Sequence, residues 1–274
     1  CLIADDCRQP RLTSEYGAIL LPNDLATTRL AANPLDDRID PYMITKTYDL
    51  TDAVTYHLGA FPPAGFKIGA TAATMQLHLG IRTPAAGFMM RSGLLASGAA
   101  SPYRSWFTPG VECEIAFRLG ADIPPGEHRQ EALAEAVAAV LPAIEIVENR
   151  YQGGGGIGTP MLIADRFFHG AAVLGADAEA WSPLRLAGRD LAAARGRMVV
   201  NGKLFGEGQG GDLLGHPLAV LRWLAASPAA AAFGGLRAGQ VILCGSVTPP
   251  AWLSGPTEVE VSFDGLGTVT ARFT

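Results

Sequence analysis

Apolar and polar residues alternate strictly in the stretch VECEIAF, residues 111–117. Side chains two positions apart on a strand point to the same face, so the pattern predicts a strand with one face against a core. The core-facing set is Val111, Cys113, Ile115 and Phe117. The same geometry places Glu112 and Glu114 together on the opposite face, with Cα atoms ~7 Å apart. Two like charges at that spacing repel unless water, a proton or a cation relieves them, so the stretch predicts a solvated face or an acidic site.

Further segments carry clear periodicities. Apolar residues recur at helical spacing in residues 50–58, 130–141 and 216–226, and Pro142 is expected to end the second of these helices. Alternation at period two predicts strands at 143–150, 240–248 and 258–273, the last one folded into a hairpin at its DGLG turn. We expect an α+β fold, with a β-sheet core and peripheral helices.

The distribution of glycine suggests two parts. Most of the 33 glycines follow residue 60, where strands become short and turns frequent. We therefore predict an N-terminal αβ element over residues 1–60 and a β-rich catalytic domain over residues 61–274.

Composition narrows the class of protein. The chain has 274 residues, of which 49% are hydrophobic and 17% charged, with a mean hydropathy of +0.21, so an ordered core is expected. The net charge of −5 and the absence of a basic cluster argue against a nucleic-acid partner. No apolar run reaches 18 residues, which argues against a membrane span. The opening CLIADDCRQP lacks the pattern of a secretory signal, and without an initial methionine the numbering is expected to begin inside a longer chain.

The four cysteines form no CxxC pair. Cys113 and Cys244 lie in apolar strand-like runs and are expected to be buried free thiols, which fits a cytoplasmic protein. The five histidines show no metal-ligand spacing such as HxxxH or HExxH, and His216, just before a predicted helix, is expected to cap or pack.

A third acidic residue extends the candidate site. In the strand-like run AIEIVENR, Glu145 projects opposite to Ile144 and Ile146. Three carboxylates on neighbouring strands could converge on one hard divalent cation, and oxygen ligands suit Mg²⁺ or Mn²⁺, whereas zinc favours histidine or cysteine. A solvated strand face would give the same pattern, so the spacing alone leaves both interpretations open.

The order of motifs along residues 45–274 resembles the 2-keto-4-pentenoate hydratase and 4-oxalocrotonate decarboxylase group of the fumarylacetoacetate hydrolase superfamily. The motifs are GFKIGATAATMQ (65–76), PAAGFM (84–89), VECEIAFRLG (111–120), PAIEIVENR (142–150), ADRFFHGAAVLG (164–175), LGHPLAVLRWLA (214–225) and AGQVILCGSVT (238–248). The resemblance implies a mixed, curved, barrel-like β core and assembly into a homo-oligomer.

The resemblance also implies roles for individual residues. Glu112, Glu114 and Glu145 match the family's ligands for Mg²⁺ or Mn²⁺. Lys67 in GFKIG matches a lysine that would donate a hydrogen bond to an enolate or transfer a proton, its alternative being an ordinary exposed lysine. The substrate pocket would involve Thr71, Gln76, Ser246 and Thr248.

Departures from the family pattern concern the substrate. Relatives read close to ADNAS where this chain has ADRFF: Asp165 is retained, but Arg166 and Phe167 replace small polar residues, and Ala72 stands where serine is frequent. A buried Arg166 would favour a substrate with an extra carboxylate, whereas an exposed one would have no such role.

The implied function is a metal-dependent lyase. The resemblance indicates a hydratase that adds water to a 2-hydroxy-2,4-dienoate, a 2-keto-4-pentenoate-like 2-keto acid, to give a 4-hydroxy-2-keto acid. The alternatives are a decarboxylase of a 2-keto dicarboxylic acid such as 4-oxalocrotonate, a fumarylacetoacetate-type C–C hydrolase and a catalytically degenerate partner subunit. Hydrolases of the superfamily commonly use a histidine and a glutamate to activate water, and because no HxxE-type pair is present near Glu112, the sequence favours the hydratase. Outside the resemblance, a β-rich small-molecule binder with a solvated acidic pair remains an alternative.

Overall fold

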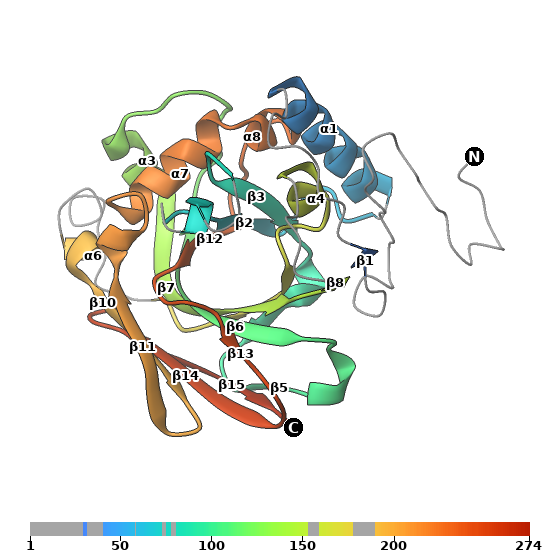
Figure 1. Ribbon diagram of the computed structural model, residues 1–274. Helices are drawn as coiled ribbons and strands as arrows, with labels where there is room; N and C mark the ends of the chain where they lie inside the picture. The colour runs from blue at the N-terminus through green and yellow to red at the C-terminus, as the bar shows by residue number, and fades with distance from the viewer. Residues whose placement is uncertain are drawn as a thin grey trace.

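The computed structural model describes residues 30–31, 41–57, 59–72, 75–77, 81–152, 159–177 and 190–274. Its centre is a curled sheet with the strand order β3-β2-β12-β6-β7-β9-β4, on which β13 pairs with β6. These strands are β2 Gly65–Gly69, β3 Ala85–Met89, β4 Leu94–Ala96, β6 Pro109–Leu119, β7 Val137–Glu148, β9 His169–Leu174, β12 Val241–Ser246 and β13 Ala251–Trp252. The α+β class and the barrel-like curvature predicted from the sequence are both confirmed (Figure 1).

A second sheet lies below the first in Figure 1, in the strand order β11-β10-β14-β15-β5. Its strands are β5 Ala99–Ser101, β10 Arg195–Val200, β11 Lys203–Gln209, β14 Thr257–Phe263 and β15 Gly267–Phe273. The predicted hairpin is β14 and β15, which pair antiparallel from Thr257–Phe273 to Phe263–Gly267. A short parallel pair joins β1 Leu30–Ala31 to β8 Tyr151–Gln152.

Helices cover the upper side of the curled sheet (Figure 1). These helices are α1 Pro41–His57, α3 Gln130–Ala136, α4 Thr159–Ala164, α7 Pro217–Ala226 and α8 Pro228–Ala232, while α6 Asp190–Ala193 lies at the side, next to β10. The single 3₁₀ turns are η1 Arg91–Gly93, η2 Tyr103–Ser105 and η3 Gly210–Asp212. The helix predicted at 50–58 is part of α1, as far as residue 57, and the helix at 216–226 is α7. His216 caps α7 as expected, because its ring Nδ1 accepts a hydrogen bond from the Leu218 N–H. None of the described helices is long and apolar enough to span a membrane.

The prediction of a helix over 130–141 is wrong beyond Ala136. The chain leaves α3 at Val137 and enters β7, which pairs with β6 along its whole length. Val137 and Val140 suit a strand as well as a helix, and the pairing partner decides between them. Pro142 lies inside β7 instead of ending a helix, at the point where the pairing with β9 stops at Ala143–Leu174.

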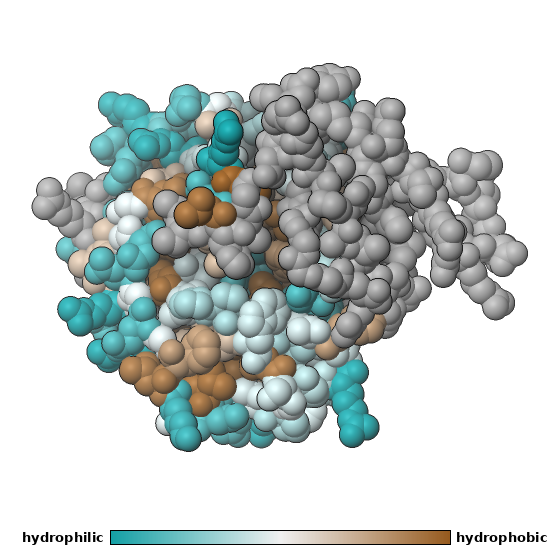
Figure 2. Space-filling model, viewed as in Figure 1, coloured by the Kyte–Doolittle hydropathy of each residue, from teal (hydrophilic) through white to brown (hydrophobic). Residues whose placement is uncertain are grey.

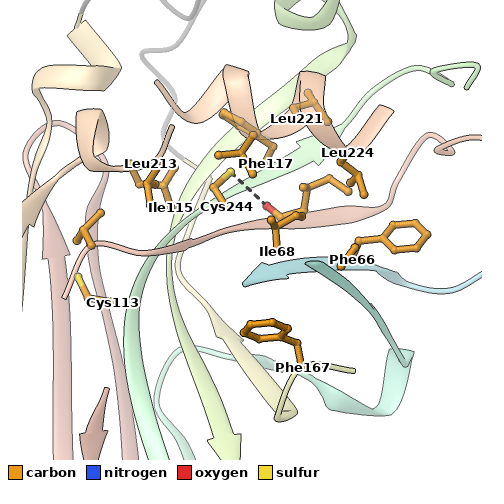
Figure 3. Close-up of a cluster of buried hydrophobic side chains, with 14 of the residues drawn as sticks. Phe66, Ile68, Cys113, Ile115, Phe117, Phe167, Leu213, Leu221, Leu224 and Cys244 are labelled. Atoms are coloured by element: carbon orange, nitrogen blue, oxygen red, sulfur yellow. Dashed lines mark hydrogen bonds between the residues drawn. The ribbon is translucent and has the colours of Figure 1, made fainter. Parts of the chain in front are cut away.

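The two faces of the central sheet carry different kinds of side chain. One face packs against the helices and the second sheet through the apolar residues of the alternating pattern, as predicted for 111–117. Figure 3 shows this packing around Phe66, Ile68, Ile115, Phe117 and Cys244, with Leu221 and Leu224 of α7 above them. Cys113 and Cys244 are buried free thiols, as expected. The opposite face is also buried and carries the acidic residues.

The structure does not test the division of the chain near residue 60, which stays a prediction. Within residues 1–60 it describes β1, α1 and residues 59–60. The contacts of α1 run to α4 and α8, both of which belong to the predicted second domain.

Candidate metal and active site

Strand register brings the three predicted carboxylates together. In the antiparallel pair β6–β7, Glu112 lies directly opposite Glu145, and Glu114 lies on the same face two positions further along β6. One carboxylate oxygen from each residue lies within 4.8 Å of the other two. Glu114 and Glu145 are fully buried and Glu112 is partly exposed. A solvated acidic face, the alternative left open by the sequence, is therefore excluded.

Lys67 joins this cluster from β2, which is separated from β6 by β12 in the strand order. It stands beside Leu243 of β12, which in turn lies opposite Ala116 of β6, so all three side chains share the face of the glutamates. The Lys67 side chain is 2% exposed, and its Nζ lies 3.3 Å from Glu145 Oε2. An exposed lysine, the alternative considered above, is excluded.

The pKa values of the three clustered glutamates are shifted in different directions. Burial followed by the charge of Glu145 raises the pKa of Glu112 to about 7, and the same two causes raise the pKa of Glu114 well above its ordinary value. Burial also acts to raise the pKa of Glu145, but Lys67 and His169 outweigh it and lower that pKa. Glu145 is thus the most readily ionised of the three carboxyl groups, while Glu112 and Glu114 take up protons more readily than ordinary glutamates unless a cation neutralises them.

The donor set fits a hard divalent cation. Three carboxylates converge, and Oε1 of Glu114 and Oε2 of Glu145 are buried without a hydrogen-bond partner among the described residues. Carboxylate oxygens of this kind are the ligands preferred by Mg²⁺ and Mn²⁺. Gly245, at φ +94°, allows its N–H to approach Glu114 Oε2 at 2.8 Å, which fixes the second oxygen of that residue.

A left-handed turn forms the wall next to Lys67. Arg166, Phe167 and Phe168 all have positive φ values, 59°, 55° and 64°, which is uncommon for residues other than glycine. The Phe167 ring occupies the space that a side chain at Gly69 would fill, and the Lys67 Nζ lies 4.7 Å from the centre of that ring. In Figure 3, Phe167 and Phe66 lie on opposite sides of β2.

Arg150 holds this turn in place. Its Nε donates to Asp165 Oδ1 at 2.8 Å and its Nη1 to Glu148 Oε2 at 3.2 Å, while its Nη2 donates to the carbonyls of Asp165 and His169. All four residues are buried. Asp165, predicted to bind substrate, is thus engaged with Arg150 through one oxygen, and its Oδ2 has no partner among the described residues.

The remaining predicted site residues occupy different positions. Gln76 donates to the Ala70 carbonyl, and Thr71 is buried against Gly245. Ser246 Oγ accepts from the Cys113 N–H and donates to the Thr248 carbonyl, so this hydroxyl supports the bend in β12. The Thr248 hydroxyl is buried without a partner among the described residues. These positions leave the roles in substrate binding as predictions.

Arg166 is partly exposed. Its Nε is buried and has no hydrogen-bond partner in the part of the chain that the structure describes, and its guanidinium lies 5.5 Å from the centre of the Phe88 ring. Burial, followed by the charge of Arg150, lowers the pKa of Arg166 to about 10, while Asp165 and Glu145 act in the opposite direction. The side chain is a partly buried cation near the site.

Sequence reasoning missed His169 and Arg150. His169 Nδ1 lies 2.8 Å from Glu145 Oε1, so a histidine–glutamate pair exists, although the two residues are 24 positions apart in the chain and no short motif marks them. The pairing of β7 with β9, which sets Val147 opposite His169, produces the contact. Arg150 carried a local signal, since an arginine two residues after the end of a buried strand is expected to pair with a carboxylate if it is buried.

A separate hollow of about 680 Å³ lies among α1, α4, α7 and α8. Tyr48, Ile163 and Trp223 contribute to its lining, and none of the three clustered glutamates does. It is therefore distinct from the acidic cluster.

Residues 74–274 match the model of the fumarylacetoacetate (FAA) hydrolase C-terminal family. The chain belongs to the fumarylacetoacetate hydrolase family. It is 32% identical over 264 residues to 2-keto-4-pentenoate hydratase 1 of Dechloromonas aromatica (strain RCB), which covers 96% of this chain and 97% of the relative. It is 35% identical over 214 residues to 2-hydroxyhexa-2,4-dienoate hydratase of Comamonas testosteroni, covering 77% of this chain and 78% of that one.

The fold is shared with solved members of the family. The structure of 4-oxalocrotonate decarboxylase from Pseudomonas putida G7, complexed with magnesium and adipate, matches with a TM-score of 0.74 at 24% identity, over 84% of this chain and 86% of that chain. Fumarylpyruvate hydrolase from Pseudomonas aeruginosa, in complex with Mn²⁺ and pyruvate, matches with a TM-score of 0.56 at 16% identity, over 76% of this chain and 88% of that chain. This family-type fold was an expectation of the sequence resemblance and is confirmed.

Proposed function

We propose that this protein is a divalent-metal-dependent hydratase, a lyase that adds water to a 2-hydroxy-2,4-dienoate to give a 4-hydroxy-2-keto acid. The observation that carries the proposal is the buried convergence of Glu112, Glu114 and Glu145 within 4.8 Å, with Lys67 3.3 Å from Glu145. The names of the relatives support it, because both are hydratases of short 2-keto or 2-hydroxydienoic acids.

The three glutamates would hold Mg²⁺ or Mn²⁺ on the face of the central sheet that is opposite the helix-packed face. Such a cation, when bound, supplies Lewis-acid stabilisation of negative charge on the 2-oxygen of a chelating 2-keto acid. Around it the protein excludes water, since Glu114 and Glu145 are fully buried and Lys67 nearly so.

Lys67 is the proposed catalytic residue. Burial disfavours its charged form, but the nearby charges of Glu145, Glu112 and Glu114 outweigh burial and raise its pKa, so it is an ammonium group. An ammonium at this position can donate a hydrogen bond to an enolate oxygen or deliver a proton to the dienoate carbon chain. The Phe167 ring on one side and Glu145 on the other restrict the position of Nζ.

The other proposed substrate-site residues divide by their contacts. Thr248, Asp165 and Arg166 have buried polar atoms without partners among the described residues and are suited to meet substrate. The other three, namely Thr71, Gln76 and Ser246, would line or support the pocket through contacts already made within the protein.

We also propose a cytoplasmic homo-oligomer. The family resemblance supports both parts of this proposal, and exposed apolar side chains support the assembly into an oligomer. Leu204 and Phe205 on β11 and Trp252 on β13 are all exposed, and Figure 2 shows an apolar patch over the five-stranded sheet.

A Mn²⁺ titration combined with a substrate assay tests the proposal. The wild-type protein is expected to bind one Mn²⁺ per chain and to consume a 2-hydroxy-2,4-dienoate, seen as loss of its ultraviolet absorbance, with the 4-hydroxy-2-keto acid as product. Glu114→Gln is expected to weaken Mn²⁺ binding and lower kcat/KM by more than about 100-fold, because even outer-shell changes at metal sites cost 10–100-fold. Wild-type protein that binds Mn²⁺ without turning over the dienoate would indicate a degenerate subunit, and failure to bind Mn²⁺ would contradict the metal site itself.

Decarboxylation of a 2-keto dicarboxylic acid such as 4-oxalocrotonate is the second candidate, and the partly buried cation of Arg166, whose Nε is buried without a partner among the described residues, favours it. Arg166→Met is expected to lower kcat/KM for a dienoate with a second carboxylate by about 10- to 100-fold, because a hydrogen bond to a charged group contributes about 1.5–3 kcal/mol. The same variant should change kcat/KM for the monocarboxylate by less than about threefold. Carbon dioxide release is measured in parallel to detect decarboxylation. Equal losses of kcat/KM with both substrates would show that Arg166 does not bind the second carboxylate.

A further inference from the structure

His169 is buried beside the acidic cluster and is fixed from several directions. Its ring is 1% exposed, and Nδ1 lies 2.8 Å from Glu145 Oε1. Its backbone N–H donates to the Arg166 carbonyl, and its carbonyl accepts from Arg150 Nη2. The residue begins β9 next to a register shift in the β7–β9 pair, which lets the ring reach back toward Glu145.

The contact with Glu145 has a defined polarity. A carboxylate oxygen only accepts hydrogen bonds, so the proton of this contact lies on His169 Nδ1. Nε2, on the other side of the ring, is buried without a hydrogen-bond partner among the described residues.

The two oxygens of Glu145 are therefore not equivalent. Oε1 accepts from His169, whereas Oε2 makes no hydrogen bond within the described part of the chain and lies 3.3 Å from the Lys67 ammonium. Rotation of the carboxylate would break the bond to His169. Without that bond, repulsion from Glu112 and Glu114 would favour other rotamers of Glu145.

We propose that His169 is a positioning residue that holds Glu145 in the orientation in which the three carboxylates converge, and that it thereby strengthens divalent-cation binding without touching cation or substrate. The inference rests on the metal site proposed above. It differs from a packing role, because it requires the Nδ1 donor and not the ring as such.

The test compares two substitutions at this position. His169→Asn keeps an N–H donor near the position of Nδ1, whereas His169→Leu fills a similar volume without a donor. Mn²⁺ affinity, measured by calorimetry, is expected to fall about 10- to 100-fold in His169→Leu and to stay within about threefold of wild type in His169→Asn. At saturating Mn²⁺, kcat of His169→Leu should return to within about threefold of wild type, since the residue acts only through Glu145.

Three results would overturn the inference while leaving the proposed function standing. The first is wild-type Mn²⁺ affinity in His169→Leu, and the second is an equal loss of affinity in both variants, which would indicate packing alone. The third is a low kcat of His169→Leu that persists at saturating Mn²⁺, which would place His169 in the chemistry itself. Absence of Mn²⁺ binding by the wild-type protein would overturn the proposed function and this inference together.

Discussion

A Lys67→Met substitution is expected to lower kcat by about 10²- to 10⁴-fold, the range for loss of a positioned proton donor. The lysine is 2% exposed, its Nζ faces Glu145 Oε2 and the Phe167 ring, and methionine has a similar length and shape, so the substitution removes the ammonium with little change in packing. Mn²⁺ binding should persist, because all three carboxylates remain and a competing positive charge beside Glu145 is removed.

Lys203→Met provides the matched control for this experiment. Lys203 is an exposed lysine on β11, in the second sheet, and its loss should change neither kcat nor Mn²⁺ affinity. Steady-state kinetics at saturating Mn²⁺ give kcat, and a calorimetric titration gives the Mn²⁺ affinity. Full kcat in Lys67→Met would remove the lysine from the mechanism, and complete loss of Mn²⁺ binding would mean that it supports the carboxylates instead.

Arg150→Met is expected to destabilise the protein by about 3–5 kcal/mol, the cost of removing one partner from a buried charge network. Arg150 donates to Asp165 Oδ1, to Glu148 Oε2 and to the carbonyls of Asp165 and His169, which flank the left-handed turn before β9. Its loss removes the hydrogen-bonded cation from two buried carboxylates and releases the turn that positions Phe167 and His169.

The comparison for this variant is Arg197→Met. Arg197 on β10 pairs with Glu207 on β11 at 2.6 Å, but both side chains are about half exposed, at 50% and 51%, so its loss should cost less than about 1 kcal/mol. Urea unfolding monitored by fluorescence measures both values. Similar destabilisation in the two variants would mean that the Arg150 network contributes no more than a surface ion pair.

Local patterns in the sequence determined much of the strand framework. Alternation at 111–117 placed Glu112 and Glu114 on one face, and the same reasoning turned Glu145 to the side opposite Ile144 and Ile146. This works because a strand's side-chain period is fixed by backbone geometry and needs no knowledge of neighbouring strands. Local pattern was insufficient at 137–141, where residues compatible with a helix became β7 because β6 provided a pairing partner.

The resemblance in the order of motifs supplied the family and the identity of the candidate ligands. It could not supply the contacts that the matched and the altered residues make in the folded chain. Asp165 matched the family position, yet the structure engages it with Arg150, which the motif comparison had not marked. Arg166 was left open between a buried and an exposed position, and the structure places it between the two, partly exposed with its Nε buried.

The sequence by itself determined the candidate site residues, namely an acidic pair on one strand face, a third glutamate and a lysine between apolar neighbours, together with the family to which the chain belongs. Only the tertiary structure decided that Glu112 stands opposite Glu145, that Lys67 reaches the same cluster from β2, and that His169 bonds to Glu145. The physical reason is strand register. A side chain's face is a local property of its own strand, whereas its neighbours across the sheet are set by pairings between segments distant in the chain, which no local spacing encodes.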